Sequence, residues 1–253
     1  MRVFRGRTDR PRTDREATGH LLDEASDGRC CVRVWAPPRQ VAFGRRDARE
    51  SGYSDARRVS EEAGFSPIER DVGGRAVAYT GDTIAFAVAT PRTGDVDSVG
   101  IHERYGWAMQ TIRSALEAVG AEVATGEPPA SFCPGDRSIR IAGGGKLSGI
   151  AQRVRADAAL VAGCLVVTRA DASEIASVLS PVYDALGIRF DPDSVGSVAG
   201  AGGPGSPRTV AREVESRLRH EIRRSNPIRG ASGDDRLATD PTDIVRVGPE
   251  EWS

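Results

Sequence analysis

One short stretch of the chain, GGGKLSGIAQR at residues 143–153, contains the only lysine in a sequence with 35 basic residues. All the other basic residues are arginine. An ammonium is a compact charge that can lose its proton, whereas a guanidinium is a planar fork that stays charged. Lys146 is therefore a candidate for a site that needs a point charge. A solvated turn that kept one lysine by chance is the alternative interpretation.

A second candidate is Cys133, in the segment PPASFCPGDRSI, thirteen residues before Lys146. Its proline and glycine neighbours predict a loop, whereas Cys164 lies in a continuous apolar run and is expected to be buried. A loop thiol close to an ammonium carries more of the nucleophilic thiolate. The intervening strand would separate Asp136 from Lys146 by ~13 to 17 Å at about 3.3 Å per residue, so the loop must fold back for the two groups to meet. An inert loop cysteine is the alternative.

The third candidate is the double glycine in IERDVGGRAVAYTG, residues 68–81. Adjacent glycines allow backbone N–H groups to turn inward as an anion-binding concavity. Arg70 and Arg75 flank Gly73 and Gly74, and their guanidinium groups could bind a phosphate or carboxyl oxygen. A plain glycine turn before a strand explains the same pattern equally well.

Lys146 also opens a predicted strand. Because side chains alternate along a strand, Lys146, Ser148, Ile150 and Gln152 are expected on one face and Gly149 on the other. The first set is a polar stripe with the lysine at its head, which suits an edge that faces a ligand. Ser148 and Gly149 are therefore candidate substrate-binding residues. A solvated hairpin end accounts for the polarity but not for the three preceding glycines.

The sequence excludes several other kinds of site. A Walker phosphate loop needs glycine where Arg140 stands and serine or threonine where Leu147 stands. The four cysteines form no C-x-x-C pair and there are only three histidines, so no metal site is expected and the thiols are expected to be free. A net charge of -1 gives no general attraction to nucleic acid or to a membrane surface. No apolar run is long enough to span a membrane and no secretory signal is present, which predicts a cytoplasmic protein.

The pattern of apolar residues predicts the elements that must position these candidates. Strands are expected at residues 32–35, 40–44, 137–141, 146–153 and 159–168, with a hairpin over residues 75–90 that turns at Gly81-Asp82. Helices are expected at residues 53–64, 100–119, 171–187 and 210–222, the third with a capping-box-like start at Asp171.

These elements predict one domain over residues 20–224. Residues 1–19 are charged and lack periodicity, which predicts a loose N-terminal arm, and residues 225–253 are predicted to form a mobile polar tail. Hairpins with interspersed helices favour an α+β fold with a mixed, largely antiparallel sheet and flanking helices over a doubly wound parallel sheet.

The order of the three candidate segments resembles the lipoate-protein ligase and octanoyltransferase family, which shares its catalytic fold with biotin-protein ligases. The similar segments are QVAFGRRD, RDVGGRAV and SFCPGDRSIRIAGGGKLSGIAQRV, and the resemblance extends from about residue 21 to residue 219. The last segment looks like the branch in which a loop cysteine carries an acyl thioester. The resemblance implies a biotin/lipoate ligase-like catalytic domain in which Cys133 is the nucleophile and Lys146 holds the acyl carbonyl oxygen. The double-glycine loop would shape the pocket.

Around the double glycine the chain departs from the ATP-dependent ligases of that family. Those ligases have an Arg-Arg pair, then a serine and three glycines, then a histidine. Here Glu69-Arg70 replaces the pair, Val72 the serine, Arg75 the third glycine and Tyr79 the histidine. These changes disfavour adenylation with ATP. The thioester route requires no cofactor and no metal, whereas a ligase would require ATP and Mg.

The resemblance therefore implies a protein acyltransferase that moves an octanoyl or lipoyl group onto a lysine of a lipoyl domain. The expected acceptors are the glycine-cleavage H protein and the acyltransferase subunits of 2-oxoacid dehydrogenases, and the donor carries an octanoyl or lipoyl group. Two alternatives are an ATP-dependent lipoate-protein ligase and a non-catalytic binder of lipoyl domains or lipoate. Neither a nucleic acid nor a membrane is an expected partner.

Overall fold

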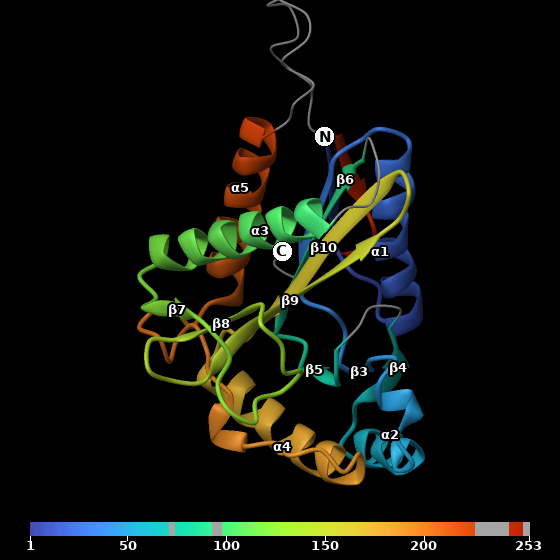
Figure 1. Ribbon diagram of the computed structural model, residues 1–253, viewed down its shortest axis with the longest axis vertical. Helices are drawn as coiled ribbons and strands as arrows, with labels where there is room; N and C mark the ends of the chain where they lie inside the picture. Colours follow the sequence, from blue (N-terminus) through green and yellow to red (C-terminus); the bar gives the residue numbers. More distant parts are fainter. Residues whose placement is uncertain (71–73, 93–97, 226–242, 250–253) are drawn as a thin grey trace, which may run out of the picture.

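A computed structural model of the protein describes residues 1–70, 74–92, 98–225 and 243–249. Its central feature is an eight-stranded sheet in the order β11-β1-β2-β6-β10-β9-β8-β7 (Figure 1). Neighbouring strands are antiparallel from β2 to β7, and β1 is parallel to both β2 and β11. The strands are β1 (Arg2–Arg5), β2 (Cys31–Trp35), β6 (Ile84–Pro91), β7 (Val123–Thr125), β8 (Ser138–Ile141), β9 (Lys146–Val154), β10 (Ala158–Leu165) and β11 (Asp243–Arg246). The expected mixed, largely antiparallel sheet is confirmed.

A smaller sheet of three strands, β4-β3-β5, lies beside one end of the large sheet (Figure 1). Its strand β3 is parallel to β4 and antiparallel to β5. Two helices cover this sheet and contact each other, and together they enclose a separate apolar core. The elements are β3 (Gln40–Phe43), β4 (Ser66–Glu69), β5 (Val77–Tyr79), α2 (Tyr53–Glu62) and α4 (Arg169–Ala185).

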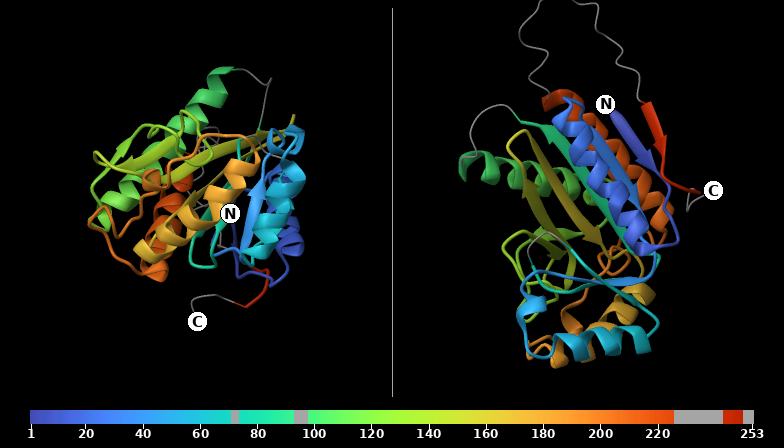
Figure 2. Two further views of the ribbon diagram at one scale, coloured as in Figure 1. Left: turned by 90° about the horizontal axis from the view of Figure 1, so that it is seen from below. Right: turned by 90° about the vertical axis from the view of Figure 1, so that its right-hand side faces the viewer.

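Helices cover both faces of the large sheet (Figure 2). Helix α1 (Pro11–Ser26) packs on β2, β6 and β10, whereas α3 (Ser98–Ala118) and α5 (Pro207–Ser225) contact each other on the opposite face. Alternation along β6 explains the two cores. Phe86 and Val88 join the core beneath α3 and α5, while Ala85, Ala87 and Ala89 join the core beneath α1. The α1 face of this strand is therefore built from small side chains.

The structure corrects four expectations about local structure. Residues 1–19 are not a loose arm, because they include β1 and the start of α1. The strands at residues 75–90 do not form a hairpin, since β5 pairs with β3 and β6 pairs with β2 and β10. Helix α4 begins before Asp171, because the side chain of Thr168 accepts the N-cap hydrogen bond from the Asp171 N–H.

The fourth correction concerns the predicted C-terminal tail. Residues Asp243–Arg246 form β11, which pairs with β1 in parallel, so this part of the tail is an edge strand of the large sheet. Residues 226–242 and 250–253 of the predicted tail lie outside the described residues. No helix in the described ranges is long and apolar enough to cross a membrane.

Candidate functional site

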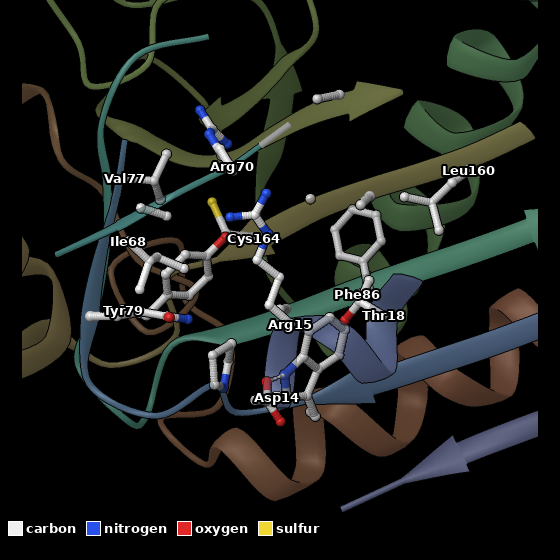
Figure 3. A pocket seen from close by; sticks show the side chains of 18 of the residues that line it. Asp14, Arg15, Thr18, Ile68, Arg70, Val77, Tyr79, Phe86, Leu160 and Cys164 are labelled. Carbon is white, nitrogen blue, oxygen red and sulfur yellow. Dashed lines mark hydrogen bonds between the residues drawn. The ribbon is translucent and has the colours of Figure 1, made fainter. Parts of the chain in front are cut away.

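A pocket of about 450 Å³ lies between α1, the large sheet and the small sheet. Figure 3 shows Arg15 and Thr18 entering it from α1, Phe86 and Leu160 from the large sheet, and Tyr79 from the small sheet. Its other apolar walls include Ile68, Val77, Ala85, Phe132 and Ala162, and its polar lining includes Arg70, Cys133 and Cys164. The pocket thus combines an apolar space with thiol and guanidinium groups.

Gly163 allows the ring of Phe86 to pack directly against the strand backbone in the wall of this pocket. A Cβ atom on Gly163 would lie 2.5 Å from Cζ of Phe86 and 2.6 Å from the carbonyl oxygen of Gly149. Both separations are far below an ordinary contact of about 3.5 to 4.0 Å. A side chain at Gly163 would therefore displace Phe86 or the strand beside it.

The loop that carries Cys133 is held in an unusual backbone conformation. Cys133 has φ of 43°, in the left-handed region that non-glycine residues rarely adopt. Its N–H donates to the hydroxyl of Tyr183 at 2.6 Å, and that hydroxyl donates to the carbonyl of Ala76 at 3.0 Å. Tyr183 is completely buried in α4. The small-sheet core thus fixes the backbone of Cys133, as is common where strain is stored at a functional site.

The sulfur of Cys133 faces the double-glycine segment. One nitrogen of Arg70, Nη2, donates to this sulfur at 3.2 Å and to the carbonyl of Arg75 at 2.6 Å. Burial disfavours the charge on Arg70, but the nearby Cys133 and Tyr79 side chains and the hydrogen bond to sulfur outweigh it and raise the pKa of Arg70. The guanidinium therefore stays charged and can stabilise negative charge on the sulfur.

Gly74 is required where it stands. It has φ of 97°, and a Cβ atom there would lie 2.6 Å from the Cys133 sulfur and 2.8 Å from Nη2 of Arg70. No other residue type fits between these groups without moving one of them. The candidate residues Arg70, Gly74 and Cys133 therefore meet at one place, although Arg70 and Cys133 are 63 residues apart in the chain.

Lys146 is reached by the Cys133 loop, as the loop hypothesis requires. Its Nζ atom donates to the carbonyl oxygens of Phe132 at 2.9 Å and Cys133 at 2.8 Å. The side chain is completely buried, so the lysine does not lie on a solvated turn. It contacts the backbone of the loop, while the group beside the sulfur is Arg70.

Lys146 and Ser148 do not lie on one face of β9, although alternation along the strand predicted that they would. A register irregularity between Ile139 and Arg140 shifts the pairing of β8 with β9. As a result Gly149, and not Ser148, lies beside Lys146, whose Cε atom is 3.3 Å from the position of a Cβ on Gly149. Gly149 lines the pocket. Ser148 is fully buried outside the pocket lining, and its hydroxyl has no hydrogen-bond partner among the described residues.

Two further candidates are placed differently from expectation. Arg75 does not point at the pocket, because its Nη1 atom pairs with Asp47 at 3.4 Å and Glu50 at 2.7 Å. Gly73 lies outside the described residues. Of the double-glycine segment, Arg70 therefore lines the pocket, Gly74 packs against Arg70 and the Cys133 sulfur, and Arg75 forms an ion pair.

Sequence reasoning missed Glu127, which contacts Lys146. Both carboxylate oxygens accept from Nζ at 3.1 Å. The hydroxyls of Ser131 and Ser138 also donate to this carboxylate. The available signal was the lysine itself, because a buried ammonium needs an acidic partner.

Sequence reasoning also missed the contribution of α1, which was assigned in part to a loose arm. Asp14 of this helix is buried and accepts hydrogen bonds from Arg33 at 2.6 Å and Trp35 at 2.9 Å. Arg33 is completely buried and also donates to Thr18 at 2.9 Å. The helix is thereby attached to β2 and forms one wall of the pocket. Pro11 at its first turn was the local signal for a helix start.

Two other titratable side chains in the pocket are held in their neutral forms. Burial raises the pKa of the Cys164 thiol, against a smaller opposing effect of a hydrogen bond with Gly149. Burial, followed by the nearby Cys164, raises the pKa of the Tyr79 hydroxyl. Cys133 is partly exposed, so it is the accessible thiol of this pocket. No group of three or more potential metal ligands occurs in the described part of the chain.

Comparisons with known proteins agree with this arrangement. A model of the lipoyl protein ligase A/B catalytic domain matches residues 13–201. This range contains most of α1, the small sheet and the Cys133 loop, together with Lys146.

Curated relatives carry the name octanoyl-[GcvH]:protein N-octanoyltransferase. The protein of an Exiguobacterium species is 28% identical over 169 residues, which are 66% of this chain and 59% of the relative. The protein of Exiguobacterium sibiricum is 31% identical over 129 residues, covering 51% of this chain and 45% of the relative. The protein of Geobacillus kaustophilus is 29% identical over 122 residues, covering 48% and 42%. The chain thus spans about half the length of the curated relatives it matches.

Solved structures share the fold. A lipoate-protein ligase A bound with ATP has a TM-score of 0.68 at 16% identity, covering 88% of this chain and 85% of the ligase. A bipartite lipoate protein ligase from Thermoplasma acidophilum, described with its E2 lipoyl domain, has a TM-score of 0.63 at 17% identity, covering 88% and 83%. At these identities the likeness establishes the fold alone.

Proposed function

The chain belongs to the lipoyl protein ligase A/B catalytic domain family, and from that premise we propose that it is a protein acyltransferase which moves an octanoyl or lipoyl group onto a lysine of a lipoyl domain. The observation that carries the proposal is the contact of the Cys133 sulfur with Arg70 at 3.2 Å, on the wall of a largely apolar pocket. A fatty acyl chain fits such a pocket because burying each methylene group is worth about 0.8 kcal/mol.

The proposed reaction has two steps. In the first, the thiolate of Cys133 attacks the acyl carbonyl of the donor, a thioester forms, and the donor's carrier leaves with a proton. In the second, the amine of the acceptor lysine attacks the thioester, an amide forms, and the Cys133 thiol is restored. A covalent intermediate divides one difficult transfer into two easier ones. Arg70 stabilises the negative charge on the sulfur before attack and after release.

Lys146 has a supporting role in this proposal. Its ammonium is directed at Glu127 and at the carbonyls of Phe132 and Cys133. Contact with the oxyanion of the transition state requires it to exchange one of these carbonyls for the acyl oxygen. Gly149 leaves space beside the lysine for this exchange.

The proposed donor is an octanoylated GcvH, the glycine-cleavage H protein, which appears in the names of the relatives. The proposed acceptors are the lipoyl domains of the acyltransferase subunits of 2-oxoacid dehydrogenases. A lipoate protein ligase of the same fold is described with an E2 lipoyl domain, which supports this choice. The thioester route requires neither a metal nor a nucleotide.

The second candidate function is an ATP-dependent lipoate-protein ligase that uses ATP and Mg. The ATP-bound ligase of the same fold favours it. Against it stand Arg75, which is paired with Asp47 and Glu50, and Tyr79, which stands where the family resemblance leads us to expect a histidine in a ligase. A non-catalytic binder of lipoyl domains is the third possibility, and the alignment of Cys133 with Arg70 argues against it.

One assay separates these functions. The protein is incubated with an apo lipoyl domain and one of three donors: octanoyl-GcvH, octanoyl carrier protein, or octanoate with ATP and Mg. Acceptor mass is followed with time. We expect transfer from an acylated protein and none from octanoate with ATP. Transfer from octanoate with release of AMP would instead establish the ligase.

The nucleophile is tested in the same assay. Cys133→Ala should abolish transfer and remove the hydroxylamine-sensitive acyl mass on the enzyme. Cys30→Ala is the matched control, since Cys30 is also partly exposed but does not line the pocket. Normal transfer by Cys133→Ala would exclude the thioester mechanism.

A further inference from the structure

A buried charged cluster lies against the backbone of the Cys133 loop. Lys146 is 0% exposed, and its ammonium meets four acceptors: the two oxygens of Glu127 at 3.1 Å and the carbonyls of Phe132 and Cys133 at 2.9 and 2.8 Å. An ammonium has three N–H donors. All of its hydrogen-bonding capacity is therefore directed at the protein itself.

The carboxylate of Glu127 connects three segments. Besides Lys146, at the start of β9, it accepts hydrogen bonds from Ser131 in the Cys133 loop and from Ser138 at the start of β8. Both serines are almost completely buried. A carboxylate can accept from all these donors because it has about four lone-pair sites. A neutral amide in its place has one oxygen and would turn N–H groups toward some of the same donors.

The charge of Glu127 is as important as its hydrogen bonds. A buried cation whose partner is removed is left uncompensated, which is more destabilising than the loss of an exposed pair. Glu127 is the acidic side chain that pairs with Lys146 in the described part of the chain, and its own side chain is 21% exposed. The ring of Phe132, 5.1 Å from Nζ, adds only a weaker cation–π contact.

This cluster determines where the sulfur of Cys133 lies. The carbonyl oxygen of Cys133 is held by Lys146, and its N–H is held by Tyr183 at 2.6 Å. With both backbone groups fixed at φ of 43°, the sulfur is directed at Arg70. Weakening the Lys146 contact allows the residue to leave this strained conformation.

We propose that Glu127 is a positioning residue: its carboxylate assembles Lys146, Ser131 and Ser138 and thereby holds the Cys133 sulfur against Arg70. Only the contribution of Glu127 to acyl transfer rests on the proposed function. The position of the sulfur is a property of the free protein and can be measured without any acyl substrate.

The experiment compares Glu127→Gln with Glu122→Gln, in the full chain with Cys30→Ser so that Cys133 is the accessible thiol. Glu122 is an exposed carboxylate five residues earlier. The rate of Cys133 alkylation by iodoacetamide is measured from pH 5 to 10 by peptide mass. Four titratable groups interact with the side chain or N–H of Cys133, namely Arg70, Tyr79, Cys164 and Tyr183, while Lys146, paired with Glu127, donates to its carbonyl. All four are unchanged in both variants.

In Glu127→Gln the rate of Cys133 alkylation near neutral pH should be about tenfold lower than in the parent, because a charge-assisted contact of sulfur with Arg70 is lost. The profile of Glu122→Gln should coincide with that of the parent. Thermal unfolding shows whether Glu127→Gln is folded. If it is not folded, the double variant Ser131→Ala/Ser138→Ala replaces it. This variant removes two donors to the carboxylate without changing charge, and it should give a smaller decrease in the rate of Cys133 alkylation.

An unchanged profile in a folded Glu127→Gln, or in the double serine variant where that replaces it, would overturn the inference. If Glu127→Gln lowers the alkylation rate but the parent protein transfers no acyl group, the positioning role is supported and only the proposed function is contradicted. An equal decrease of the alkylation rate in Glu122→Gln would also overturn the inference, since the loss of any nearby negative charge would then explain the effect.

Discussion

Substitution of Gly74 by alanine tests the contact between the Cys133 sulfur and Arg70 with a single methyl group. The new Cβ atom would lie 2.6 Å from the sulfur and 2.8 Å from Nη2 of Arg70. Ordinary contacts of carbon are about 3.5 to 4.0 Å, so the sulfur must move by roughly 1 Å. The substitution therefore displaces the two groups of the site directly and removes no side chain from it.

The size of the effect follows from this displacement. A misplacement of about 1 Å in a reacting group costs on the order of 100-fold in rate. The backbone penalty is separate, because alanine in the left-handed region costs roughly 1 to 2 kcal/mol. In a chain of this size that penalty lowers the melting temperature by about 2 to 4 °C per kcal/mol.

Gly81→Ala is the matched control. Gly81 has φ of 105°, close to the 97° of Gly74, and a Cβ atom there would meet nothing within 4 Å. Both variants should therefore lose similar stability. Only Gly74→Ala should lose acylation of Cys133, measured as the rate at which hydroxylamine-sensitive mass appears on the enzyme with octanoyl-GcvH as donor.

Two results would refute this reasoning. Acylation of Gly74→Ala at the parent rate would mean that the contact of Arg70 with sulfur has no part in the reaction. Equal losses of rate in Gly74→Ala and Gly81→Ala would mean that backbone strain, and not the position of the sulfur, causes the effect.

Two other outcomes are expected. Lys146→Arg should lose both transfer activity and stability, because a larger guanidinium in a fully buried site typically costs about 1 to 3 kcal/mol. Its control is Arg140→Lys, on the partly exposed neighbouring strand, which should leave the melting temperature unchanged. A normal melting temperature for Lys146→Arg would contradict the burial of Lys146. Burial raises the pKa of the Cys31 thiol from 9.0 to about 12. Between these two pKa values the thiol is ionised in the unfolded chain but still protonated in the folded one. The contribution of this thiol to the free energy of unfolding therefore falls as the pH rises through that range. Cys31→Ala should lessen that fall in urea unfolding series, and an equal fall in both proteins would contradict the assignment.

Much of the fold could be predicted from apolar periodicity. The long helix with Ile112 and Leu116 on its buried face and the apolar run that became β10 were both identified, because each carries a clear pattern over many residues. The hairpin around Gly81 was wrong because turn signals are local, whereas the partner of a short strand is chosen by the whole sheet. The N-terminal helix was missed because its mean hydropathy is low and a buried Asp14 stands on the face that packs inward.

The candidate site was predicted in part. Cys133, Arg70 and Gly74 were identified from local sequence, since loop cysteines and glycine turns have local signals, and the structure brings them together. Glu127 could not be found in this way, because the need for it arises only from the burial of Lys146. The alternation rule misplaced Ser148, because β9 carries an extra residue between Lys146 and Ser148 opposite β8, and such an irregularity is invisible to a pattern of period two.

The attachment of α1 to the large sheet bears on the thermodynamics of ligand entry. Asp14 binds Arg33 and Trp35 of β2 with hydrogen bonds of 2.6 and 2.9 Å in the protein interior, so this wall of the pocket is held in place in the free protein. Ordering a mobile segment on binding subtracts from affinity, and a preorganised wall avoids that entropic loss. Under the proposed function, a flexible acyl chain that enters beside α1 would lose its own rotational freedom, but it would meet a wall that the Asp14–Arg33 salt bridge already holds in place. On the proposed function, such a wall would exclude bulky chains by steric contact, with no need for a closing movement of the helix.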